Sequence, residues 1–136
     1  MAHILLIEDN EPNLELMTYL LSASGHEVTS ATTGEGGIAL AAADTPDLVI
    51  LDIQLPDLSG YEVLTQLRRS GAVQAVPVVA VTANAMVGDR DQALSAGFDG
   101  YLPKPIEPAS FGRAIDAFLP DALRGHQPES QWVSHG

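Results

Sequence analysis

The stretch VILDIQLPDLSG, residues 49–60, decides the fold. Its first residues, together with Leu48, form a continuous apolar run of the kind that fills a β-strand buried on both faces. The run ends at Asp52, and a turn rich in Pro, Asp and Gly follows. An isolated carboxylate at a strand end usually caps a turn. A functional role for Asp52 therefore needs support from the rest of the chain.

Short apolar runs alternate with segments of helical period along the whole chain. Two further runs are continuous, HILLI at 3–7 and VPVVAV at 76–81, and two are weaker, HEVTSA at 26–31 and GYL at 100–102. Parallel strands need crossover connections, and a helix usually supplies them. The alternation therefore predicts an α/β domain, a doubly wound five-stranded parallel sheet with five helices on its two faces.

Local signals mark the predicted helices. Asn10 is a suitable N-cap for the first helix, Ser59 and Glu62 have the spacing of a capping box for the third, and Gly97 is suited to end the fourth. The second helix, within 35–45, opens poorly because two glycines follow its start. The last helix is predicted from apolar residues at helical spacing: Phe111, Ile115, Phe118 and Leu119.

The composition indicates one cytoplasmic domain. At 136 residues the chain can bury a single core without disulfides. It contains no cysteine, which excludes a thiol nucleophile and a thiolate metal site and fits a reducing compartment. The first residues lack the basic segment of a signal peptide, and no apolar run is long enough to span a membrane. We therefore predict the cytoplasm and no membrane partner.

The charge disfavours nucleic acid as a partner. Eighteen acidic and six basic residues give a net charge of −12. Nucleic-acid binding depends largely on cationic side chains that neutralise phosphates. We expect no direct contact with nucleic acid.

The composition changes at Pro120. All predicted strands and helices lie within residues 1–119, whereas residues 120–136 combine prolines and glycines without a sustained period. We predict one domain over 1–119 and a short polar C-terminal tail over 120–136. Trp132 is expected in a frayed tail rather than on the core.

Polar side chains follow four of the predicted strands. Glu8 and Asp9 follow the first, Asp52 the third, Thr82 and Ala83 the fourth, and Lys104 the fifth. Ligands of open α/β sheets bind beyond the carboxyl ends of the strands. Two carboxylates about 4 Å apart repel by about 1 kcal/mol in water and about 4 kcal/mol at an effective dielectric of 20. Such a cluster needs a cation, and its oxygen ligands suit Mg²⁺.

This set of side chains favours phosphoryl transfer. A carboxylate beside Mg²⁺ can attack a phosphoryl group while the metal and a lysine ammonium neutralise the phosphoryl oxygens. The expected product is an aspartyl phosphate at Asp52.

The same residues, with Gly60, Tyr101 and the Lys104–Pro105 pair, resemble the receiver (CheY-like) domain of two-component response regulators. The resemblance covers about Ile4 to Leu119 and implies the strand order 2-1-3-4-5. The segments EDNEPN, LDIQLP, PVVAVTANAM and KPI are similar to those of DivK-like single-domain regulators and of receiver domains in hybrid histidine kinases.

The resemblance implies a role for each matching residue. Asp9 would bind Mg²⁺ directly and Glu8 mostly through water. Asp52 would be both a metal ligand and the phosphorylated residue, and the backbone carbonyl of Gln54 would be a further ligand. Pro105 would follow a cis peptide bond.

The resemblance also implies how phosphorylation would be read. The Thr82 hydroxyl and the Ala83 N–H would bind phosphoryl oxygens, and Lys104 would pair with the phosphate. Thr82 would then move toward the phosphate and Tyr101 would follow inward. The change would remodel the face made by the fourth helix, the fifth strand and the fifth helix. Tyr101 is also consistent with a plain core residue.

The chain departs from the common receiver pattern at two places. LPDLSG stands where many receivers have MPxMDG, so Ser59 replaces a common aspartate, and we interpret this change as structurally neutral. The resemblance places Gln54 and Asn84 at positions that in this family tune the access of water to the acyl phosphate. The lifetime of the phosphorylated state is therefore not predicted.

We predict a single-domain response regulator of a phosphorelay. A histidine kinase or histidine phosphotransfer protein would phosphorylate Asp52 in the presence of Mg²⁺, and with no effector domain after Leu119 the output would be protein–protein contact. Alternatives are a receiver module derived from a hybrid histidine kinase and a phosphate-independent scaffold. A phosphohydrolase of the haloacid dehalogenase type is disfavoured, because Gln54 stands where those enzymes need a second acid. We expect no enzymatic activity beyond self-phosphotransfer and slow autodephosphorylation.

Overall fold

The computed structural model describes residues 2–71, 73–83 and 88–124. Five parallel strands form one sheet in the order β2-β1-β3-β4-β5. The predicted doubly wound fold and the strand order are confirmed. The strands are β1 (His3–Ile7), β2 (Glu27–Ala31), β3 (Leu48–Asp52), β4 (Val78–Thr82) and β5 (Gly100–Pro103).

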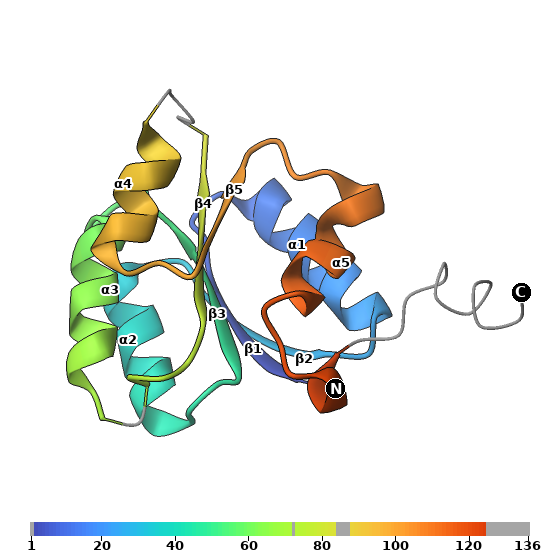
Figure 1. Cartoon of the computed structure of the whole chain (residues 1–136), viewed down its shortest axis with the longest axis horizontal. Helices are drawn as coiled ribbons and strands as arrows, with labels where there is room; N and C mark the ends of the chain where they lie inside the picture. The colour runs from blue at the N-terminus through green and yellow to red at the C-terminus, as the bar shows by residue number, and fades with distance from the viewer. Residues whose placement is uncertain (1, 72, 84–87, 125–136) are drawn as a thin grey trace, which may run out of the picture.

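Helices cover both faces of the sheet, with α1 and α5 on one side and α2, α3 and α4 on the other (Figure 1). A short 3₁₀ helix, η1, follows α5. The bounds are α1 (Glu11–Ala23), α2 (Gly34–Ala43), α3 (Gly60–Arg69), α4 (Asp89–Ala96), α5 (Pro108–Asp116) and η1 (Asp121–Leu123).

Alternate residues of the strands feed two hydrophobic cores. Along β3, Leu48 and Ile50 pack with α1 and α5, whereas Val49 and Leu51 pack with the helices on the opposite face. All five residues of β3 and of β4 are buried. Because successive side chains of a strand point to opposite faces, a continuous apolar run is required here.

The predicted helix caps are confirmed. The Asn10 side chain accepts a hydrogen bond from the Asn13 N–H at 3.0 Å, and the Ser59 hydroxyl oxygen accepts one from the Glu62 N–H at 3.2 Å. Gly97 ends α4 with a φ of 114°, in the left-handed region that favours glycine.

The glycines that open α2 have a packing role. A β-carbon on Gly37 would meet the side chain of Ile7, so α2 lies directly against β1 at this point. The low helix propensity of glycine is therefore the cost of a close approach between helix and strand.

Element ends differ from the predicted ones by a few residues. β3 includes Asp52, and β4 begins at Val78, after Pro77. Helix α5 ends at Asp116, but Leu119 is still buried in the following turn. The Arg124 Nε donates to the carbonyls of Asp116 and Leu119 at 2.9 and 3.1 Å. Trp132 lies outside the described residues.

Candidate functional site

The carboxyl ends of the strands meet at one edge of the sheet, at the top of Figure 1. Glu8 follows β1, Asp52 is the last residue of β3, Thr82 the last of β4, and Lys104 follows β5. The parallel order of the strands therefore brings together side chains that are far apart in the sequence.

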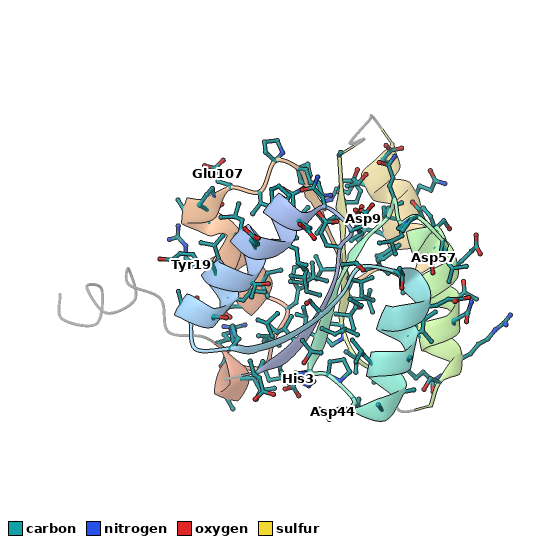
Figure 2. The ribbon with its side chains drawn as sticks, turned by 180° about the vertical axis from the view of Figure 1, so that it is seen from behind. His3, Asp9, Tyr19, Asp44, Asp57 and Glu107 are labelled. Atoms are coloured by element: carbon teal, nitrogen blue, oxygen red, sulfur yellow. The ribbon has the colours of Figure 1, made fainter. Side chains whose placement is uncertain are left out.

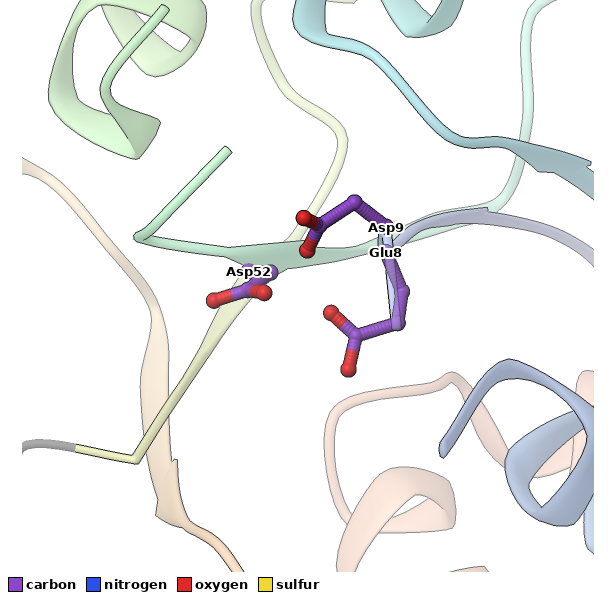
Figure 3. Close-up of side chains that lie close together, drawn as sticks. All are labelled: Glu8, Asp9 and Asp52. Atoms are coloured by element: carbon purple, nitrogen blue, oxygen red, sulfur yellow. The ribbon is translucent and has the colours of Figure 1, made fainter. Parts of the chain in front are cut away.

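Three carboxylates converge at this edge (Figure 3). Glu8, Asp9 and Asp52 each place an oxygen within 4.8 Å of the other two. Glu8 and Asp52 are only 1% and 4% exposed, whereas Asp9 is exposed. One side of the cluster is therefore buried and the other opens to solvent.

The Lys104 ammonium contacts two of the carboxylates. Its Nζ lies 2.6 Å from Glu8 Oε1 and 3.2 Å from Asp52 Oδ2. The backbone N–H of Lys104 donates to the Thr82 carbonyl at 2.8 Å, which fixes the start of the loop after β5. The Lys104–Pro105 peptide bond is cis. One lysine thus pairs with two of the three acidic side chains.

The electrostatics of the cluster leave negative charge to be compensated. Burial raises the pKa of Glu8 to about 7, and the neighbouring Asp52 carboxylate adds to the shift, although Lys104 opposes it. Burial alone would lower the pKa of Lys104, but the Glu8 and Asp52 carboxylates outweigh it and raise that pKa. The metal-free cluster therefore favours keeping protons.

The cluster fits a magnesium ion. Glu8 Oε2 is buried and has no hydrogen-bond partner among the residues that the structure describes. Buried carboxylate oxygens are costly without a partner. A hard cation that prefers oxygen ligands would satisfy both this atom and the excess negative charge.

The loop after β3 is held close to its strand. The Gln54 N–H donates to Asp52 Oδ1 at 2.9 Å, and the Gly60 N–H donates to the Ile53 carbonyl at 2.7 Å. A β-carbon on Gly60 would lie 2.6 Å from the Ile53 α-carbon, so only glycine fits here. These contacts fix the orientation of the Asp52 carboxylate.

The remaining predicted residues lie around this cluster. Thr82 is buried at the end of β4, and Ala83 and Gln54 are exposed at the edge of the sheet. Tyr101 packs on the core beneath α2, α3 and α4, and its buried hydroxyl has no hydrogen-bond partner within the described part of the chain. Asn84 lies outside the described residues.

Sequence reasoning missed the contact made by Asp57. Its carboxylate accepts hydrogen bonds from the N–H groups of Gly34 and Glu35, at the start of α2. Aspartate is a common helix cap. Here, however, the two N–H groups that it caps belong to Gly34 and Glu35, which lie 23 and 22 residues before Asp57 in the chain. No local spacing could have identified it.

The fold and the acidic edge define a CheY-like α/β protein with a site at the carboxyl ends of its strands. The sequence pattern of the response regulator receiver domain matches residues 4–116. The chain therefore belongs to the response regulator receiver domain family.

The chain matches curated response regulators along nearly their whole length. The chain is 40% identical over 119 residues to the polar-differentiation response regulator DivK of Brucella anthropi, an alignment that covers 88% of this chain and 97% of that protein. The DivK protein of Brucella ovis shows the same identity and coverage. The acidic cluster is thus set in a chain similar to DivK along most of its length.

Solved structures show the same fold. The receiver domain of sensor histidine kinase PA1611 from Pseudomonas aeruginosa PAO1 is 34% identical, with a TM-score of 0.79 over 86% of this chain and 96% of that one. That structure has a magnesium ion coordinated in its active-site cleft. A CheY-like receiver domain protein from Methanospirillum hungatei JF-1 is 28% identical, with a TM-score of 0.78 over 86% and 92% of the two chains.

Within residues 2–71, 73–83 and 88–124, every helix is too short or too polar to cross a bilayer.

Proposed function

We propose that this receiver domain accepts a phosphoryl group on Asp52 from a phosphohistidine and signals through altered contacts with a protein partner. The donor would be a histidine kinase or a histidine phosphotransfer protein. The juxtaposition of the buried Asp52 carboxylate with Glu8, Asp9 and the Lys104 ammonium carries this proposal.

The transfer step uses one carboxylate oxygen of Asp52 as the nucleophile. The bond between phosphorus and the histidine nitrogen breaks, its electron pair returns to the imidazole, and a new bond joins phosphorus to Asp52. Hydrolysis of that acyl phosphate returns the carboxylate and releases inorganic phosphate.

Neighbouring groups of the chain support this step. Lys104, already 3.2 Å from Asp52, is placed to pair with a phosphoryl oxygen. The Thr82 hydroxyl and the Ala83 N–H, from the end of the adjacent strand β4, would bind two more. Mg²⁺, when bound by Asp9, Asp52, the Gln54 carbonyl and, through water, Glu8, would neutralise charge on the phosphoryl oxygens.

The proposed output is a change in the face formed by α4, β5 and α5. Thr82 and Tyr101 belong to the same face of the sheet, because Ala80 pairs with Tyr101 across β4 and β5. A movement of Thr82 toward the phosphate would free space that Tyr101 can enter. The net charge of −12 favours a protein partner over nucleic acid.

Intact mass measurement with acetyl phosphate tests the acceptor. We expect the wild-type chain to gain one phosphoryl group in the presence of Mg²⁺ and none in EDTA. Asp52→Asn should gain none, whereas the matched control Asp91→Asn, at an exposed carboxylate of α4, should still be modified. Modification of Asp52→Asn, or a wild-type chain that stays unmodified and does not bind beryllofluoride, would contradict the proposal.

Amide NMR spectra test the output. On phosphorylation we expect chemical shift changes at residues of α4, β5 and α5 as well as around Asp52. Changes confined to the acidic cluster would remove the proposed output surface. Partner binding that is the same for wild type and Asp52→Asn would favour a phosphate-independent scaffold.

A further inference from the structure

Asp57 joins the loop after Asp52 to the helix α2. We call residues 53–59 the β3–α3 loop. Within it, Asp57 Oδ1 accepts a hydrogen bond from the Gly34 N–H at 2.8 Å, and Oδ2 accepts one from the Glu35 N–H at 3.0 Å (Figure 2). The Thr33 hydroxyl separately accepts from the Gly36 N–H at 3.0 Å. Asp57 and Thr33 therefore cap the same helix. Of these two caps, Asp57 is the one that belongs to the β3–α3 loop, where the neighbouring Leu58 also lies close to Gly34.

These hydrogen bonds favour a charged Asp57. The Glu35 N–H, followed by the Gly34 N–H, holds the pKa of Asp57 below its ordinary value. The positive end of the α2 dipole favours the same anion. The connection therefore persists at neutral pH.

Helix α2 is in turn fixed to the strand that carries Glu8 and Asp9. Gly37 of α2 lies against the side chain of Ile7, the last residue of β1. The carbonyl of Ala31, just before α2, accepts a hydrogen bond from the Glu8 N–H at 3.0 Å. A shift of α2 relative to this strand would disturb both contacts.

The β3–α3 loop also contacts Asp52, the proposed phosphoryl acceptor. The Gln54 N–H binds Asp52 Oδ1 at 2.9 Å, and the Gly60 N–H binds the Ile53 carbonyl at 2.7 Å. The β3–α3 loop is thus tied to the Asp52 carboxylate, while Asp57 ties the same loop to α2.

We propose that Asp57 is a positioning residue for the metal site: through α2, it sets the β3–α3 loop, with Asp52 and Gln54, against the β1 end that carries Glu8 and Asp9. This inference rests on the proposed function, because it assigns Asp57 to the same Mg²⁺ and acceptor site. Asp57 is not one of the residues that would bind the metal or the phosphoryl group.

The expected effect follows from how outer residues act on metal sites. Residues that orient metal ligands change metal affinity about 10- to 100-fold when removed. Asp57 is exposed and acts through a loop, so we expect the lower end, about tenfold weaker Mg²⁺ binding in Asp57→Ala. Phosphorylation by acetyl phosphate at subsaturating Mg²⁺ should slow in proportion.

The experiment compares the full chain with Asp57→Ala, Asp57→Asn and Thr33→Ala. Calorimetry measures Mg²⁺ affinity, mass spectrometry measures the phosphorylation rate, and hydrogen exchange of the Gln54 amide reports loop order without metal. Thr33→Ala removes a cap from the same helix but leaves the loop connected, so it controls for loss of helix stability. Asp57→Asn keeps one carbonyl acceptor and should recover part of the affinity.

We expect Asp57→Ala to bind Mg²⁺ more weakly and to exchange the Gln54 amide faster, with Thr33→Ala close to wild type in both. Equal Mg²⁺ affinity in Asp57→Ala and Thr33→Ala would reduce Asp57 to a helix cap and overturn the inference. If Asp57→Ala does not fold, unchanged affinity in Asp57→Asn would overturn it equally. A wild-type chain without Mg²⁺ binding or phosphorylation would instead refute the proposed function.

Discussion

Glu8 is the side chain that shows most clearly that the acidic cluster is electrostatically unfavourable without a cation. It is buried, one of its oxygens has no hydrogen-bond partner in the described chain, and burial raises its pKa to about 7. Asp52 shares the same lysine at 3.2 Å. The site is therefore assembled at a cost to the metal-free fold, as expected where charged groups are arranged for function.

Replacing Asp52 should stabilise the metal-free protein. Asp52→Asn removes a carboxylate beside Glu8 but keeps an acceptor for the Gln54 N–H, so the free energy of unfolding should rise by about 1 kcal/mol. Urea denaturation in EDTA measures this change. Asp9→Asn, at the exposed position of the cluster, should show a smaller gain. A less stable Asp52→Asn would mean that its ion pair with Lys104 outweighs the repulsion.

The raised pKa of Glu8 predicts a pH dependence. Without Mg²⁺, the folded protein keeps the Glu8 proton up to about pH 7, whereas an ordinary glutamate releases it near 4.5. Between these values the folded state binds more protons, so stability is greatest below the lower value and falls as pH rises toward the upper one, by about 1 to 3 kcal/mol.

Melting temperatures in EDTA across this pH interval test the prediction. Glu8→Gln is neutral throughout and should lose this part of the pH dependence. Glu15→Gln, at an exposed carboxylate of α1, should keep the wild-type profile. Parallel profiles for wild type and Glu8→Gln would assign the dependence to other groups.

At the scale of helices and strands, the sequence predicted the features that depend on residues close together in the chain. The apolar runs predicted the strands, and Asn10, Ser59 and Gly97 predicted helix ends, because each of these residues acts on backbone within a few positions. Gly37 was interpreted as a weakness of α2, because its contact with Ile7 depends on how the helix packs on the sheet. Such contacts need the tertiary structure.

Arg68 is a second long-range contact without a sequence signal. At the end of α3, its Nη1 donates to the Val76 carbonyl at 2.6 Å, and its Nη2 donates to the Gly97 carbonyl at 3.2 Å and to Asp99 Oδ2 at 2.8 Å. Asp99 Oδ2 also accepts from the Val78 N–H at 2.8 Å. One guanidinium thus joins α3 to the loops before β4 and β5.

Removing this guanidinium should destabilise the fold. Arg68→Ala should lower the free energy of unfolding by about 1 to 2 kcal/mol, because a charge-assisted hydrogen bond and carbonyl partners are lost at a partly exposed site. Arg69→Ala is the matched control, because Arg69 is the next residue along the chain and its side chain is exposed. This substitution should change the free energy of unfolding by less than about 0.5 kcal/mol. Equal losses in urea denaturation would exclude a special role for Arg68.

For the whole molecule, the site was predictable because the topology is simple. Parallel strands with crossover helices place all carboxyl ends at one edge, so Glu8, Asp52 and Lys104 could be assigned to one site before any distance was known. The separation of the carboxylates, the raised pKa of Glu8 and the connection through Asp57 could not be predicted. They depend on how closely the loops pack.

Magnesium should stabilise the whole domain. A ligand that binds only the folded state at a concentration 100 times its dissociation constant adds about 2.7 kcal/mol, which raises the melting temperature of a chain this size by roughly 5 to 10 °C. Thermal scans should compare MgCl₂ with NaCl at equal ionic strength, because salt also screens the net charge of −12. Equal effects of the two salts would argue against a specific site.

The sheet also divides the molecule into two compartments. Asp52 continues the row of Leu48 and Ile50, which face α1 and α5, whereas Thr82 continues the row of Val78 and Ala80, on the side where Tyr101 packs. Buried strand residues separate the two rows, so in the proposed function a change at Asp52 would reach Tyr101 around the carboxyl edge of the sheet. Substitutions that rigidify the loops at this edge would then prevent Tyr101 from responding to phosphorylation, while Asp52 could still be phosphorylated.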